Sequence, residues 1–293
     1  MQIMVAEYAS QMIPKLADEG RAILDSLCAG FRACGHVVYI PQAPRSDEKA
    51  YEEQIARTAK KCDAGIVVAP DHLLYEFTTC VEANTVNLGC PASAVKKATD
   101  KLKSSRLLRK KSIPVPEINP ASGPYVLKPR HGCGAEGVRV VGHFDREDLA
   151  EDTFVSRFVM GEHISASLIV GHAVLPLSIN KQLIRINEHI YYHGNMTPYP
   201  VPDPTRVLQH AINAAQLLGC RGYVGIDIVL ERDGTSTIVD INARPTTAIV
   251  SINHLMGNVA ELILNARLGY ELPDLVTLRG KHTFLKQQAP LRR

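Results

Sequence analysis

A hairpin in the C-terminal third of the chain constrains the fold more than any other segment. Two apolar, β-branched runs flank an Asp-Gly turn at 233–234 in the stretch GIDIVLERDGTSTIVDINAR, and such a turn is a strong hairpin signal. If Arg232 faces Thr235 across the turn, Asp227 lies directly opposite Asp240. The sequence therefore predicts two carboxylates side by side on one face of an antiparallel strand pair.

The opposed carboxylates favour a metal site. Like charges directly opposite one another destabilise a strand pair unless a cation neutralises them. Asn242 lies two residues beyond Asp240 and shares its face, so it adds a neutral oxygen beside Asp227 and Asp240. Oxygen ligands of this kind suit Mg²⁺ or Mn²⁺ better than zinc. The alternative is a solvent-facing hairpin with incidental acids, but opposed acids without a cation are unusual. Asp227, Asp240 and Asn242 are therefore the predicted metal ligands.

A glycine-rich hairpin is expected in the middle of the chain, at YVLKPRHGCGAEGVRVVG. Gly132, Gly134 and Gly137 match the dinucleotide fingerprint G-x-G-x-x-G, which requires a helix after the glycines. The following VRVV run reads instead as a strand, which disfavours a dehydrogenase. A glycine loop between antiparallel strands can fold over a polyphosphate, with Lys128 supplying positive charge. A flexible surface hairpin is the alternative.

Residues 1–92 alternate strand and helix patterns, which predicts a small parallel α/β sheet. Strands are expected at 3–6, 37–40 and 64–69, and helices at 16–31, 48–62 and 76–88. Ligands of such sheets bind beyond the carboxyl ends of strands, where Glu7, Tyr8 and Asp71 fall. Glu7 is therefore a candidate substrate contact, although an exposed loop carboxylate explains it equally well. Further helices are expected at 93–111, 204–218 and 252–268.

Composition excludes several classes of protein. No apolar run approaches the ~20 residues of a membrane span, and the N-terminus lacks the features of a signal peptide, so a cytoplasmic protein is expected. Seven cysteines without a Cys-x-x-Cys pair indicate reduced thiols. The net charge of 33 − 30 = +3 includes no long basic block, which argues against nucleic-acid binding. Small molecules are the expected partners, no membrane is involved, and a homodimer stays open.

In order and spacing, these motifs resemble the ATP-grasp ligases. The resemblance rests on Asp100-Lys101, Lys128 with its glycine loop, the hinge-like segment 154–162, Asp227, and Asp240-Ile241-Asn242-Ala243-Arg244. It implies an α/β (α+β) ATP-grasp fold with an N-terminal Rossmann-like parallel α/β domain at 1–92. A central ATP-grasp subdomain with the glycine-rich loop would span 93–160, and a C-terminal subdomain with the metal site would span 161–293.

The resemblance also implies roles for individual residues, with ATP and Mg²⁺ or Mn²⁺ as cofactors. Lys101, Lys128 and the loop glycines would contact the nucleotide phosphates, and the backbone of Arg157, Phe158 and Val159 would hold adenine. Arg244 and Lys128 would be catalytic, because the planar fork of Arg244 suits the γ-phosphate or the activated carboxylate. Many relatives bind ribose with a carboxylate two residues after the hinge glycine. That place is His163 here, so Glu162 is the expected ribose contact.

Within the family, four segments look like the tyramine–L-glutamate ligases of methanofuran biosynthesis. They are Glu7-Tyr8-Ala9, Glu19-Gly20-Arg21, Asn180-Lys181-Gln182 and Tyr192-His193-Gly194-Asn195. This implies substrate contacts at Glu7, Lys181, His193, Asn195 and Arg244. It also implies a γ-glutamyl amide made through an acyl phosphate, with release of ADP and phosphate. Two alternatives stay open: another ligase or kinase on the same scaffold, and a nucleotide-binding module without turnover.

Overall fold

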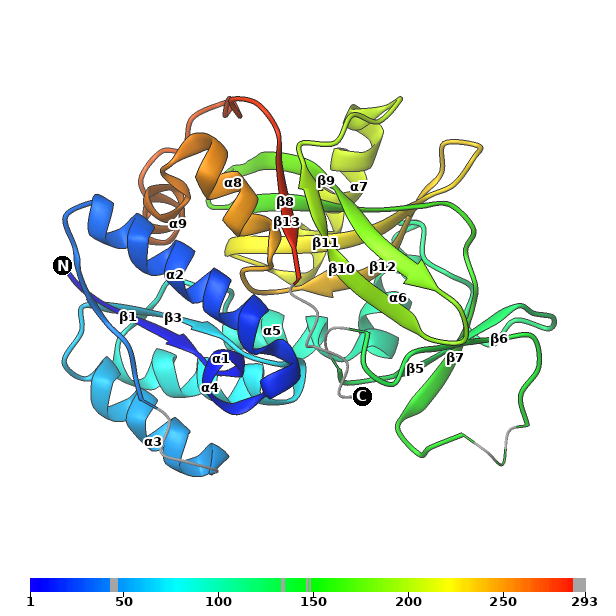
Figure 1. Cartoon of the computed structure of the whole chain (residues 1–293), viewed down its shortest axis with the longest axis horizontal. Coiled ribbons are helices and arrows are strands. Elements are labelled where there is room, and N and C mark those ends of the chain that lie inside the picture. Colours follow the sequence, from blue (N-terminus) through cyan, green and yellow to red (C-terminus); the bar gives the residue numbers. More distant parts are fainter. Residues whose placement is uncertain (43–46, 133–134, 146, 148, 287–293) are drawn as a thin grey trace, which may run out of the picture.

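Three β-sheets organise the part of the chain that the structure describes (Figure 1). The structure is a computed structural model that describes residues 1–293 except 43–46, 133–134, 146, 148 and 287–293. A parallel sheet near the N-terminus and a small antiparallel sheet lie at opposite ends of the molecule. A six-stranded sheet lies between them (Figure 1).

The N-terminal sheet is parallel, as the alternating pattern predicts, and has the strand order β2-β1-β3-β4. The fourth strand was not predicted, because it lies within the segment 76–88 that was expected to be helical. Its strands are β1 (Gln2–Glu7), β2 (Val37–Tyr39), β3 (Ala64–Val68) and β4 (Val86–Asn87). Its helices are α1 (Ala9–Met12), η1 (Pro14–Leu16), α2 (Ala17–Ala33), α3 (Glu48–Ala59) and α4 (Asp71–Asn84). The apolar stripe of α2 is buried in one core with residues of α8 (Ala248–Met256) and α9 (Val259–Leu268). The N-terminal sheet therefore packs directly onto the C-terminal part of the chain.

The predicted helix at 93–111 is two helices, α5 (Ala92–Ala98) and α6 (Lys101–Lys110). The break falls at Asp100, whose backbone is extended. The Asp100 side chain caps α6 by accepting the N–H of Lys103 at 3.0 Å. The small antiparallel sheet follows, with β5 (Tyr125–Pro129) between β6 (Arg139–Val141) and β7 (Thr153–Arg157). The residues after the glycines therefore form a strand, which confirms that no Rossmann fingerprint is present at this loop.

The six-stranded sheet has the order β12-β11-β8-β9-β10-β13. Its elements are β8 (Glu162–Val170), β9 (Val174–Ile186), β10 (Ile190–Thr197), β11 (Gly222–Leu230), β12 (Ser236–Asn242) and β13 (His282–Leu285). Helix α7 (Pro204–Leu218) matches its prediction. The predicted helix at 252–268 is instead two helices, α8 (Ala248–Met256) and α9 (Val259–Leu268). Gly257, with φ +82°, ends α8 in the left-handed conformation that favours glycine.

The hairpin of β11 and β12 confirms that Asp227 pairs with Asp240, but by a different route from the prediction. Glu231 pairs with Thr235, so the loop has three residues rather than two and shifts the register by one. A bulge at Val239 then restores the register before Asp240 is reached. The two deviations cancel, and the carboxylates still lie opposite each other.

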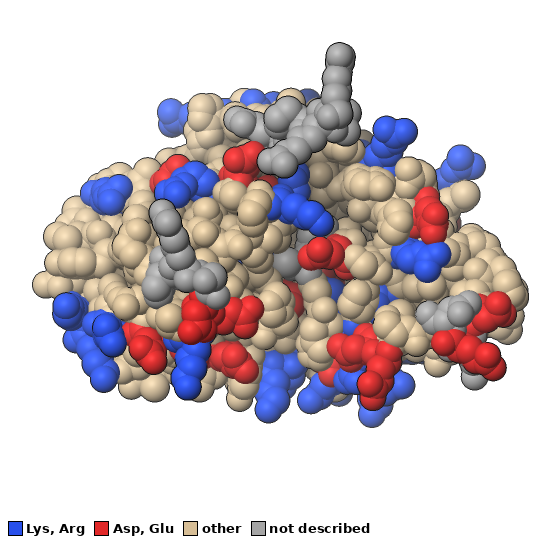
Figure 2. All heavy atoms as spheres, turned by 60° about the horizontal axis from the view of Figure 1, so that its bottom comes forward, with Lys and Arg blue, Asp and Glu red and all other residues tan. Residues whose placement is uncertain are grey.

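Acidic and basic side chains are interspersed over the face shown in Figure 2, without a large patch of one sign. No helix in the described ranges is long and apolar enough to cross a membrane. The division into three domains stays a prediction, although the boundary after residue 160 does fall in the turn between the last strand of the small sheet and the first strand of the large one.

Candidate active site

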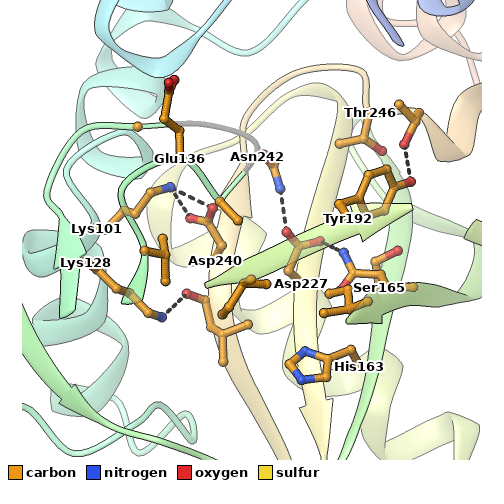
Figure 3. Close-up of a pocket in the computed structure, with 18 of the residues that line it drawn as sticks. Lys101, Lys128, Glu136, His163, Ser165, Tyr192, Asp227, Asp240, Asn242 and Thr246 are labelled. Atoms are coloured by element: carbon orange, nitrogen blue, oxygen red, sulfur yellow. Dashed lines mark hydrogen bonds and ion pairs between the residues drawn. The ribbon is translucent and has the colours of Figure 1, made fainter. Parts of the chain in front are cut away.

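A large cavity lies where the three sheets meet, and most of the predicted site residues line it (Figure 3). These residues are Glu7, Lys101, Lys128, Gly132, Arg157, Phe158, Val159, Asn195, Asp227, Asp240, Asn242 and Arg244. Gly137 lines an adjoining pocket together with Gly132, and Gly134 lies outside the described residues. The fold thus brings together residues that are more than 230 positions apart in the sequence.

Both carboxylates have protein partners, but only Asp240 has a charged one. Asp227 accepts hydrogen bonds from Gln182 Nε2 at 2.9 Å and from Asn242 Nδ2 at 3.1 Å (Figure 3). Asp240 binds Lys101 Nζ through both carboxylate oxygens, at 2.7 and 2.6 Å. Burial and the neighbouring charge of Asp240 nevertheless raise the pKa of Asp227 to about 7. Asp227 is therefore a carboxylate under electrostatic strain.

Asp227→Asn is expected to stabilise the protein when nucleotide and metal are absent. The folded pKa near 7 lies above the unfolded value of about 3.9, so the folded state binds more protons between these values. The stability of the wild type therefore falls as the pH rises through this window, whereas the asparagine carries no charge at any pH. The advantage of the variant should grow from about pH 5 to pH 8, to roughly 1–2 kcal/mol after solvent screening. Urea unfolding at both pH values measures it, and a constant or negative difference would contradict the strain.

Lys101 is held at the centre of the site by two acids. Its ammonium lies 3.0 Å from Asp71 Oδ2 as well as against Asp240. Although burial disfavours the charge, Asp240 and Asp71 raise the pKa of Lys101 above its ordinary value. Lys101 is therefore a permanent cation in the cavity wall, as a phosphate contact requires.

Lys128 reaches the cavity from β5 with little to neutralise it. Its ammonium donates to the carbonyl oxygen of Val239 at 3.3 Å, the residue that the bulge removes from the strand ladder. Burial and the nearby charge of Lys101 lower the pKa of Lys128 to about 8, despite the opposing effect of Asp240. An anion in the cavity would favour its charged form further, and the position beside the glycine loop suits a phosphate.

Arg244 lies two residues after the end of β12, and its guanidinium group has few hydrogen-bond acceptors. One of its terminal nitrogens donates to the Pro245 carbonyl at 3.3 Å, whereas its buried Nε has no hydrogen-bond partner among the described residues. A buried, unsatisfied guanidinium nitrogen is costly unless a ligand completes it. Arg244 therefore fits an anionic group inside the cavity.

Glu7 ends β1 and lines the opposite side of the cavity. Its carboxylate accepts the N–H of Ala9 at 2.9 Å and that of Ser10 at 2.8 Å, and burial raises its pKa. Gly20 in α2 lies against it, where an added Cβ would lie 2.5 Å from Glu7 Oε1 and 2.7 Å from the Ser10 nitrogen. Gly20 therefore allows α2 to close over the Glu7 carboxylate.

Gly20→Ala is expected to lower the free energy of unfolding by about 1–3 kcal/mol, since the methyl group collides with backbone as well as with the carboxylate. Gly142→Ala is the matched control, because its Cβ would meet no atom within 4 Å. Chemical unfolding of both variants measures the difference. A Gly20→Ala protein as stable as the control would show that the contact relaxes without cost.

The hinge between β7 and β8 lies at an apolar end of the cavity. The apolar lining there includes Val126, Val138, Phe158, Ile184, Val229 and Val239. The N–H of Arg157 donates to the Glu117 carbonyl at 2.8 Å, and that of Phe158 to the Pro124 carbonyl at 2.9 Å. The N–H of Val159 has no acceptor among the described residues. Of the three predicted adenine contacts, Val159 therefore has the free backbone donor.

Three predicted ligand contacts do not line the cavity, and their neighbours do. Glu162 instead accepts from Tyr199 at 2.9 Å and pairs with Lys181 at 3.4 Å. Successive side chains alternate across a strand, so His163 lines the cavity in place of Glu162, and Gln182 in place of Lys181. His193 lies at a bulge in β10, between the lining residues Tyr192 and Asn195.

Asn195, a predicted substrate contact, belongs to a polar network at the N-terminus of α8 whose member Thr247 the sequence does not predict. The hydroxyl of Tyr192 lies 2.6 Å from Thr247 Oγ1 and accepts from Asn195 Nδ2 at 2.8 Å (Figure 3). Gln182 was missed as well, although it lies within a resembling segment and strand alternation places it on the other face from Lys181. Asp71 is predicted to lie at the ligand-binding edge of the parallel sheet, but the sequence assigns it no role, and the structure shows its contact with Lys101.

The residues present fit a divalent cation held jointly with a nucleotide. No group of three or more His, Cys, Asp or Glu side chains that could hold a metal occurs in the described ranges. Asp227, Asp240 and Asn242 therefore offer an incomplete oxygen shell. Mg²⁺ is commonly bound in this way, by one or two carboxylates plus waters and substrate phosphates. The unsatisfied Arg244 Nε and the weakly paired Lys128 fit those phosphates.

Comparisons with known proteins agree with this geometry. Residues 98–248 match the family model described as an ATP-grasp domain. The tyramine–L-glutamate ligase of Methanocaldococcus jannaschii is 33% identical over 218 residues, which cover 73% of this chain and 66% of that protein. The enzyme of the same name from Methanocaldococcus fervens is 32% identical over 234 residues, covering 77% and 74%.

A solved structure shows the same fold over the whole chain. The crystal structure of an ATP-grasp superfamily protein from Archaeoglobus fulgidus superposes with a TM-score of 0.80 at 26% identity. The match covers 100% of this chain and 94% of that one.

Proposed function

Because the chain belongs to the ATP-grasp family of ATP-dependent carboxylate–amine ligases, we propose that it joins the γ-carboxylate of L-glutamate to tyramine. ATP would be converted to ADP and phosphate, and γ-glutamyltyramine would be released. The observation that carries the proposal is the single cavity, in which the opposed Asp227 and Asp240 share walls with Lys101, Lys128 and Arg244.

The charges of the cavity suit phosphoryl transfer to a carboxylate. Lys128 and Lys101 place two ammonium groups beside the opposed acids. The unsatisfied Arg244 lines the same cavity, and its planar fork suits an acyl oxygen together with the transferred phosphoryl group. A bound Mg²⁺ would neutralise charge on the terminal phosphates. Positioning and preorganised charge then supply most of the rate in reactions of this class.

The substrate pair is supported by similarity and by the chemistry of the cavity wall. The tyramine–L-glutamate ligases are among the curated relatives. At the end of the cavity formed by α2 and α8, Leu16, Ile23 and Ala248 offer apolar surface beside the hydroxyl network of Tyr192 and Thr247. An aromatic amine with a phenolic hydroxyl matches that combination of groups.

An ADP-release screen tests this function. Amino acids, each paired with tyramine, phenethylamine or ammonia, are assayed against ATP alone. The proposal expects the highest turnover with glutamate plus tyramine, together with a γ-linked amide product by mass spectrometry. A different preferred pair would reassign the substrates within the family. Turnover with no pair above the ATP-only rate would favour a nucleotide-binding module without catalysis.

A further inference from the structure

Asp71 connects the N-terminal sheet to the predicted metal site. It begins α4 just beyond β3, and its side chain is only 6% exposed. Its Oδ2 accepts from Lys101 Nζ at 3.0 Å, while the same ammonium binds both oxygens of Asp240. One buried cation is thus shared between a predicted metal ligand and a carboxylate from another sheet.

We propose that Asp71 is a positioning residue for the metal–nucleotide complex, because it holds Lys101 in place while Asp240 turns to the divalent cation. The inference rests on the metal site of the proposed function. It assigns to Asp71 a role that no predicted ligand set includes, since Asp71 itself binds neither metal nor nucleotide.

The hydrogen-bond count of Lys101 supports this role. An ammonium has three donors and no acceptor. In the free protein, Lys101 directs two contacts to Asp240 and one to Asp71. When Asp240 binds a cation, the first two become available to phosphate oxygens. The contact with Asp71 can stay unchanged, so Nζ keeps its position beside the phosphates.

The charge balance points the same way. A divalent cation bound between Asp227 and Asp240 lies close to the ammonium of Lys101, and this like-charge repulsion opposes metal binding. Asp71 compensates, because the Lys101–Asp71 pair has no net charge once Asp240 is engaged by the metal. Without the Asp71 carboxylate, the full charge of Lys101 would act on the metal.

Calorimetric titration of ADP with and without Mg²⁺ tests the inference. The measured quantity is the ratio of the two dissociation constants, which reports metal linkage without requiring turnover. Asp71→Asn should reduce the Mg²⁺-dependent gain in ADP affinity by about tenfold or more, while metal-free ADP binding stays equal or becomes tighter. Thermal unfolding establishes that the variant is folded.

Asp100→Asn is the matched control, because it removes a neighbouring carboxylate that binds Arg130 and the Lys103 N–H rather than Lys101 Nζ. Its Mg²⁺ ratio should equal that of the wild type. The double variant Asp71→Asn/Lys101→Gln gives a second test. If Asp71 acts through Lys101, the change at 71 should have no effect on the ratio in the Lys101→Gln background.

Two outcomes would overturn the inference. One is a wild-type ratio in folded Asp71→Asn, which would leave Asp71 as a purely structural ion pair. The other is an equal effect of Asp71→Asn with and without Lys101. A wild-type protein that binds ADP but gains no affinity from Mg²⁺ would overturn the metal site of the proposed function as well. The failure of the metal site is thus seen in the wild type, whereas the failure of the Asp71 inference alone is seen only in the variants.

Discussion

Asp240→Asn is expected to lower kcat by about two to three orders of magnitude at saturating Mg²⁺ and substrates. The carboxylate of Asp240 lies opposite Asp227 and is the main acceptor of the Lys101 ammonium. Its loss therefore removes a predicted metal ligand and leaves the Lys101 ammonium paired with Asp71 alone. Because both effects concern the transferring phosphoryl group, turnover should fall much further than the affinity for ADP.

Asp233→Asn is the control for this variant, since it removes the same charge from the turn of the same hairpin. Asp233 is exposed, does not line the cavity, and accepts the Thr235 N–H at 2.9 Å, which asparagine can also accept. Steady-state kinetics and ADP titration of both variants separate turnover from binding. An Asp240→Asn enzyme with wild-type kcat would refute the metal assignment.

Arg244→Ala is expected to reduce kcat by about 10²–10³-fold and to leave the affinity for ADP nearly unchanged. The reason is that Arg244 is proposed to bind the reacting oxygens rather than adenine, as its unsatisfied guanidinium in the cavity suggests. Arg244→Lys should restore little, because a single ammonium cannot reproduce the planar fork. Parallel losses of kcat and of ADP affinity in Arg244→Ala would instead assign Arg244 to nucleotide binding.

The sequence predicts best where a local pattern decides the structure. The strand after the glycines can be predicted from its own residues. The hairpin of β11 and β12 depends only on strand alternation and one turn. Even there, the three-residue loop and the bulge at Val239 escaped prediction. The pairing of Asp227 with Asp240 was nevertheless right, because the two irregularities offset each other.

Side-chain direction is what the motifs alone could not decide. Glu162, Lys181 and His193 belong to segments that do border the cavity, yet strand alternation and a bulge in β10 aim their neighbours inward. A resemblance to a family therefore predicts which segment borders a site more reliably than which residue faces it. A shift of one position along a strand moves every side chain to the other face of the sheet.

The ion pairs between residues far apart in the sequence could not be predicted, for a different reason. The opposition of two acids suggested an external cation, but Lys101 from α6 provides one within the protein. Asp71, at the start of α4, joins them through its contact with Lys101 at the start of α6, and only the tertiary fold brings these two helix ends together. The metal assignment accordingly rests on the incomplete oxygen shell and the unsatisfied Arg244, rather than on charge opposition by itself.

The most direct test of the account is the fate of the carboxylate oxygen during turnover. With glutamate labelled with ¹⁸O in its γ-carboxylate, plus tyramine and ATP, attack of the carboxylate on the γ-phosphate transfers one labelled oxygen to the released phosphate. Mass spectrometry of the products should therefore find ADP, singly labelled phosphate and an amide that retains the other labelled oxygen. Label in AMP, with pyrophosphate as the second product, would contradict phosphoryl transfer to the carboxylate and with it the assigned roles of Lys128 and Arg244.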